Sequence, residues 1–64
     1  MLIKLREFRQ KNKIPVKKLL EFLNSEYEYT YFRKEQGKAK FSLKEAYEIS
    51  KAFNIPIEFF LINN

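Results

Sequence analysis

Residues 16–37 constrain the fold of this 64-residue chain more than any other stretch. Apolar side chains recur at helical spacing in the first part of the stretch, at Val16, Leu19, Leu20 and Leu23. A short polar break begins at Asn24, and a second segment of helical length ends at Gly37, which is the only glycine in the chain. The pattern predicts two short helices joined by a tight polar turn.

The flanking segments are also predicted to be helical. Pro15 ends the first helix, since a residue before proline avoids the helical conformation, and the spacing of Ser42 and Glu45 fits a capping box. No alternating β pattern extends over more than a few residues. The expected fold is all-α, a compact bundle of five short helices in a single domain over 1–64. The expected helices are 2–12, about 15–23, about 27–36, about 43–53 and a last turn at 57–61.

The chain contains no cysteine and no histidine, so disulfides and thiolate or imidazole metal ligands are excluded. Seven phenylalanines and four tyrosines must therefore fill the core of a domain of marginal size. The same absence removes the most common nucleophiles and general bases. We expect no enzymatic activity, no metal, no cofactor and no small-molecule ligand.

The net charge of +5 is distributed unevenly. Residues 1–25 contain seven Lys or Arg against two acidic residues, whereas residues 41–64 contain two against three. This asymmetry is typical of a protein with one face toward a polyanion, although a solubilising basic surface has the same composition. No apolar run approaches a membrane span and no signal peptide is visible, so we expect a cytoplasmic protein that does not bind membranes.

The helix predicted over about 27–36 mixes aromatic and cationic side chains, and it follows a helix and a tight turn. This arrangement is typical of a helix-turn-helix reader of DNA, whose second helix enters the major groove. Two lysine pairs flank that helix in the sequence and are expected to contact phosphates without reading bases. A solvated basic face is the alternative. The expected phosphate contacts are Lys17, Lys18, Lys38 and Lys40.

Several spacings agree with one known pattern over about residues 5–61. They are Leu5-Arg6 with Arg9, Leu19 and Asn24 around the turn, Glu35-Gln-Gly37-Lys38, and the closing Glu58-Phe59-Phe60. In these positions the chain resembles the lambda-repressor-like (Cro/Xre) family of helix-turn-helix domains. The resemblance implies that the second and third helices form the helix-turn-helix. It also implies a sequence-specific regulator of transcription that binds double-stranded DNA, a small repressor.

The resemblance implies which residues face the bases. Because the turn is one residue longer than usual, counting back from Glu35 and counting forward from Asn24 give different positions. Forward counting moves the first two base-facing positions to Tyr27 and Glu28. Backward counting uses the firmer anchor, and with Thr30 added for its hydroxyl the expected base contacts are Glu28, Tyr29, Thr30 and Arg33.

Each of these side chains has chemistry suited to a base. Arg33 can donate to O6 and N7 of a guanine, or it can contact a phosphate or remain solvated. Glu28 can accept a hydrogen bond from a cytosine amino group, or it can complement the helix dipole. Tyr29 and Thr30 can offer hydroxyls to phosphate or a face to a thymine methyl group.

Other positions are assigned to the scaffold by the same resemblance. Arg9 and Glu35 are implied to form an ion pair that ties the first helix to the end of the third, and Tyr31 is implied to be buried. Leu20 stands where the family has a small alanine. Lys34 stands where it has an apolar residue, so only the aliphatic stem of Lys34 is expected to be buried.

The C-terminal residues are unusually apolar for a tail. Family members often dimerise near this end, which implies a homodimer on a near-palindromic operator, with Phe59 inward and Phe60 or Ile62 outward. These residues could instead only cap the core.

A second class of function fits the same scaffold, namely a protein-interaction module such as an antirepressor or an antitoxin-like partner binder. It is favoured by the aromatic content of the third helix, because tyrosine is typical of protein interfaces.

Overall fold

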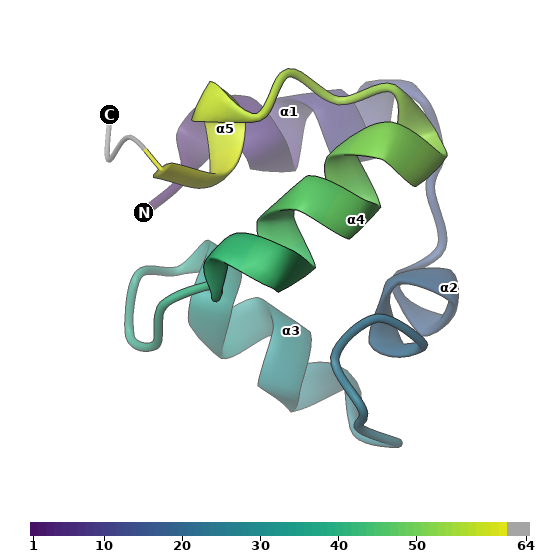
Figure 1. The fold of residues 1–64 in the computed structure, drawn as a ribbon, viewed down its shortest axis with the longest axis vertical. Coiled ribbons are helices and arrows are strands. Elements are labelled where there is room, and N and C mark those ends of the chain that lie inside the picture. The colour runs from purple at the N-terminus through teal and green to yellow at the C-terminus, as the bar shows by residue number, and fades with distance from the viewer. Residues whose placement is uncertain (62–64) are drawn as a thin grey trace.

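The computed structural model describes residues 1–61, and these residues form five helices and no strand. The all-α prediction is therefore confirmed. Among the described residues, no helix has both the length and the apolar composition needed to cross a membrane. The helices are α1 (Ile3–Lys11), α2 (Val16–Leu20), α3 (Glu28–Glu35), α4 (Leu43–Phe53) and α5 (Glu58–Leu61) (Figure 1).

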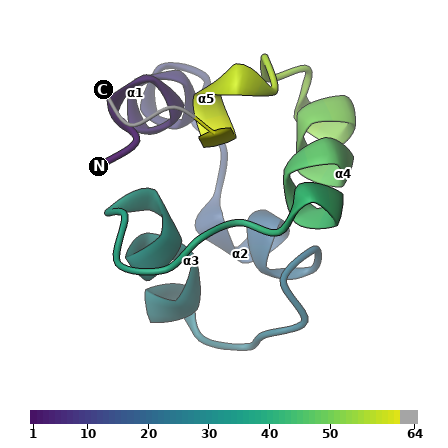
Figure 2. The ribbon, with the colours of Figure 1, turned by 60° about the vertical axis from the view of Figure 1, so that its left-hand side comes forward.

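The helices are arranged in two pairs that α4 connects. α1 and α5 lie side by side at one end of the molecule, and α2 and α3 pack together at the other end (Figures 1 and 2). α4 follows the loop after α3 and leads back to α5.

α1 ends in a pair of backbone hydrogen bonds that reverse the chain. The Ile14 N–H donates to the Arg9 carbonyl at 2.9 Å and the Lys13 N–H donates to the Gln10 carbonyl at 3.2 Å, which is the Schellman arrangement. Lys13 adopts a φ of 52°, a left-handed conformation that more often belongs to glycine or asparagine. Pro15 then forms the N-cap of α2.

α2 is shorter than predicted because its last turn tightens. After Leu20 the chain continues in two i→i+3 turns, from the Phe22 N–H to the Leu19 carbonyl and from the Leu23 N–H to the Leu20 carbonyl. These turns keep Leu23 in the core, and Asn24, with a φ of 54°, then reverses the chain as expected.

The predicted ends of α3 and α4 are confirmed. Gly37 adopts a φ of 85°, and the N–H of Lys38 donates to the Arg33 carbonyl at 2.8 Å in a second Schellman arrangement. Ser42 and Glu45 form both bonds of a capping box, and Asn54 ends α4 in a left-handed conformation.

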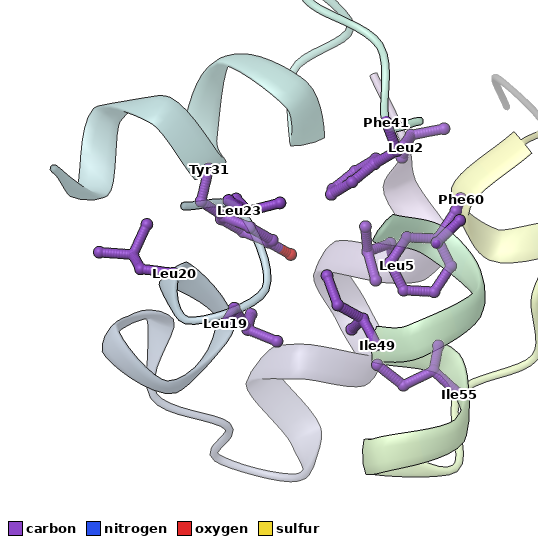
Figure 3. Close-up of a cluster of buried hydrophobic side chains, with 11 residues drawn as sticks. Leu2, Leu5, Leu19, Leu20, Leu23, Tyr31, Phe41, Ile49, Ile55 and Phe60 are labelled. Atoms are coloured by element: carbon purple, nitrogen blue, oxygen red, sulfur yellow. The ribbon is translucent and has the colours of Figure 1, made fainter. Parts of the chain in front are cut away.

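The core is built from apolar side chains of every helix and of the connecting segments (Figure 3). Aromatic rings meet edge to face at its centre, with Phe41 6.0 Å from Tyr31 and 5.1 Å from Phe60 between ring centroids. Leu20 is accommodated within this core despite standing where the resemblance implies a small residue. The buried residues are Leu2, Leu5, Leu19, Leu20, Leu23, Tyr31, Phe41, Ala46, Ile49, Ile55 and Phe60.

The expectation that Phe60 faces outward as a dimer contact is wrong. Its side chain is 4% exposed and packs against Phe41, whereas Phe59 lies half-buried at the edge of α1 against Phe8. The reason is that α5 is a single turn that begins after Ile57, and this start directs Phe60 toward the core. Leu61 is the exposed apolar residue of α5. The other candidate, Ile62, lies outside the described residues.

Candidate nucleic-acid interface

The outer side of α3 presents polar and aromatic groups to solvent. Tyr29 and Arg33 lie one helical turn apart on this side, both are exposed, and Glu28 is exposed beside them. None of the three side chains forms a hydrogen bond or ion pair with another described residue. This face is therefore free to bind a partner.

α3 begins one residue later than predicted. Glu28 is the first helical residue, and Tyr27 is the extended N-cap with φ −110° and ψ 126°. Tyr29 consequently lies in the first turn of the helix, and Tyr27 lies just outside it.

Thr30 is less available than the sequence suggested. It is half-buried, and its Oγ1 accepts a hydrogen bond from the Ser25 hydroxyl at 2.9 Å. The same Ser25 oxygen accepts from the Tyr27 N–H at 3.1 Å. The two bonds fix the turn before α3 to its first turn, so Thr30 orients the start of α3 and keeps only its hydroxyl proton for a phosphate or a base.

The four lysines expected to contact phosphates are all exposed. Lys17 and Lys18 belong to α2, which packs beside α3, while Lys38 and Lys40 belong to the loop that follows α3 (Figure 2). None of them forms an ion pair within the described part of the chain. The structure thus places unpaired positive charge on both segments that adjoin α3 in the sequence, without bringing the two pairs together.

The inner side of α3 is held by a buried cluster formed by Arg9, Tyr31 and Glu35. Arg9 Nε donates to Glu35 Oε1 at 3.0 Å and Arg9 Nη2 donates to Oε2 at 3.1 Å, so the pair implied by the resemblance is present and bidentate. The Tyr31 hydroxyl donates to the same Oε1 at 3.2 Å. Glu35 is only 3% exposed, and both of its carboxylate oxygens accept hydrogen bonds from these donors.

The surroundings of the buried cluster shift two pKa values. The hydrogen bond to Glu35 raises the pKa of Arg9 against the opposing effect of burial, and burial together with the Glu35 carboxylate raises the pKa of Tyr31. Tyr31 is therefore a neutral donor across the physiological range. The cluster ties α1 to the last turn of α3 and fixes the orientation of the outer face.

A second ion pair holds the loop after α3. Lys34 Nζ lies 2.9 Å from Glu45 Oε1 and donates to the Lys40 carbonyl at 3.1 Å. Burial raises the pKa of Glu45, but the hydrogen bonds from Lys34 and from the Ser42 N–H outweigh it, and the pKa is lowered overall. The sequence reasoning missed this pair because it expected only the stem of Lys34 to be buried and assigned Glu45 to the capping box alone.

Comparison with known protein families, with curated proteins and with solved structures finds no match. The resemblance to the Cro/Xre family and the helix-turn-helix interpretation of α2 and α3 therefore stay predictions. What supports a function is the geometry of α3 itself.

Proposed function

We propose that this protein is a sequence-specific regulator of transcription, a small repressor that inserts α3 into the major groove of double-stranded DNA. The observation that carries the proposal is the contrast between the two sides of α3. Tyr29 and Arg33 are exposed on the outer side and have no hydrogen-bond or ion-pair partner within residues 1–61, while the buried cluster holds the inner side in place. A reader of base edges needs this combination of free polar groups and a fixed backbone.

The unpaired lysines supply the affinity that does not depend on sequence. Lys17, Lys18, Lys38 and Lys40 lie on the segments adjoining α3, and a lysine without an acidic partner is free to replace the counterions of a phosphate. A protein making several such contacts loses orders of magnitude in affinity between low and moderate salt.

Arg33 supplies the strongest base discrimination in this proposal. Its guanidinium can donate to O6 and N7 of one guanine, which is worth about 1–3 kcal/mol against another base. Glu28 adds an acceptor for the amino group of a cytosine or an adenine. Two copies of the chain on a near-palindromic operator would double these contacts.

The test begins with selection of bound duplexes from a random pool, followed by measurement of Kd for the selected site across a range of salt. Arg33→Ala should relax the base preference at one position, whereas Lys38→Ala should weaken binding to all duplexes about equally and reduce the salt dependence. Both residues are exposed and unpaired, so each variant is the control for the other. Failure to bind any duplex at low salt contradicts the proposal.

A second function, binding of a protein partner through the same helix, is favoured by one observation. Tyr27 and Tyr29 are both more than half exposed, and exposed tyrosines are frequent at the centres of protein interfaces. An antirepressor or antitoxin-like partner binder would use them without needing the lysines. Lys38→Ala would leave the affinity for such a partner unchanged, whereas it would weaken binding to DNA.

A further inference from the structure

Tyr27 and Tyr29 form an exposed aromatic surface at the start of α3. Their ring centroids lie 5.6 Å apart with an interplanar angle of 35°, and the two residues are 60% and 63% exposed. We call these two residues the tyrosine pair. Two neighbouring rings left in water form a small apolar surface that a ligand can cover.

Tyr27 also occupies a position where tyrosine does not favour the helix. It is the N-cap of α3 and gives no side-chain hydrogen bond to the first turn, a bond that Ser, Thr, Asp or Asn would provide. Its own N–H is bound by Ser25, and its ring contacts only Tyr29 among the described aromatic residues. Tyr27 therefore contributes neither a capping bond nor core packing, and such a departure from local preference is expected at functional positions.

The residue between the two rings defines what the tyrosine pair can bind. Glu28 carries an exposed carboxylate without an ion-pair partner among residues 1–61, so a phosphate approaching this end of α3 would be repelled. Amino groups are attracted to the carboxylate instead. The start of α3 therefore favours base edges over the DNA backbone.

The major groove offers one apolar group to such a surface. Each base edge there presents hydrogen-bond donors and acceptors, and only the C5-methyl group of a pyrimidine is apolar. We propose, on the basis of the proposed function, that the tyrosine pair recognises pyrimidine C5-methyl groups, supplied by thymine or by 5-methylcytosine. Glu28 accepts a hydrogen bond from the amino group of 5-methylcytosine or of a base next to the methylated one.

The experiment removes single methyl groups from the DNA. Deoxyuridine replaces each thymine of the selected duplex in turn, and Kd is measured by fluorescence anisotropy. At the one or two positions read by the tyrosine pair, Kd should rise about fourfold per methyl group, which corresponds to ~0.8 kcal/mol for burying one such group. A cytosine placed at the same position, with or without its C5-methyl group, distinguishes the two sources of the methyl group.

Protein variants show whether the tyrosine pair is responsible. Tyr29→Ala and Tyr27→Ser should bind the thymine and the deoxyuridine duplexes equally, while Tyr29→Phe, which keeps the ring, should retain the fourfold difference. Tyr27→Ser restores a capping side chain, so loss of the helix does not explain its result. Tyr47→Ala removes a comparably exposed tyrosine from α4 and should leave the ratio unchanged.

Three results overturn the inference. The first is that deoxyuridine replaces every thymine without a change in Kd, which leaves DNA binding intact but excludes a methyl preference. The second is that Tyr29→Ala lowers affinity for both duplexes and leaves their ratio intact, which makes the ring a support for the helix. Absence of binding to any duplex overturns this inference together with the proposed function.

Discussion

The two sides of α3 carry the same kinds of residue in opposite surroundings. Tyr31 on the inner side is fully buried and donates to Glu35, whereas Tyr29, two residues away, is 63% exposed and its hydroxyl is unpaired among the described residues. Arginine shows the same contrast. Arg9 is bound through two nitrogens to Glu35, and Arg33 of α3 itself has no acidic partner within residues 1–61.

The contrast teaches that residue type alone does not identify a binding residue in so small a domain. On the inner side, charge and hydroxyl groups satisfy one another and fix the helix. On the outer side, the same groups keep their full capacity to bind. The inner side should therefore control stability, and the outer side should control recognition.

The largest effect is expected from Glu35→Gln. This change leaves the Arg9 guanidinium without its carboxylate in a partly buried site, and breaking such a pair costs about 3 kcal/mol. Urea denaturation followed by circular dichroism measures the loss. The matched change on the outer side, Glu28→Gln, should cost no more than ~1 kcal/mol, the usual contribution of a carboxylate at an exposed helix start. Equal losses would mean that the two sides do not differ as described.

Tyr31→Phe compares the two sides of α3 by removing a single hydroxyl group from the inner side. The Glu35 carboxylate loses a buried donor, which should lower the free energy of unfolding by about 1.5 kcal/mol. Tyr29→Phe removes the same atom from the exposed side and should change stability by less than ~0.5 kcal/mol. Thermal unfolding of the two variants beside the unmodified protein gives the comparison, and a larger effect of Tyr29→Phe would reverse it.

Tyr27→Ser should stabilise the protein while weakening recognition. A serine at the N-cap can bond to the first turn of α3, and such a cap is worth about 1 kcal/mol. Tyr29→Ser removes the neighbouring ring without adding a cap, so it should give no gain in the same urea titration. A loss of stability in Tyr27→Ser would show that its ring supports the fold.

The smallest effect is expected from Glu45→Gln, and it concerns stability at acidic pH. Because the pKa of Glu45 is lower in the folded protein than its ordinary value of 4.5, its contribution is complete above that value and is lost as pH falls through the folded pKa. Glu45→Gln should therefore flatten the decline of stability below pH 4.5, with a difference from the unmodified protein under ~1 kcal/mol. Unfolding free energies measured between neutral and acidic pH check this, and parallel curves would contradict it.

Most of the fold could be predicted from local patterns. Pro15, Gly37, Asn54 and the Ser42–Glu45 capping box act through backbone conformation or hydrogen bonds within a few residues. The start of α2 and the ends of α3 and α4 are therefore close to those expected. The left-handed Lys13 could not be predicted, because lysine has no preference for the conformation that the Schellman arrangement at the end of α1 requires.

The candidate site was only partly predictable. Helical spacing counted back from Glu35 was enough to select Glu28, Tyr29 and Arg33 as the residues expected to face the bases. The contact of Tyr27 with Tyr29 and the bond from Ser25 to Thr30 depend on how the longer turn closes. Phe60 was misassigned because a one-turn helix has too few residues for periodicity to define its inner side.

The sequence by itself determined an all-helical chain with an aromatic core, no cysteine or histidine chemistry and an excess of positive charge near its N-terminus. These properties follow from composition and from interactions within a few residues. Only the tertiary structure decided which groups are satisfied and which are free. The pairing of Lys34 with Glu45, for example, joins residues 11 positions apart, and no local rule fixes partners at that distance.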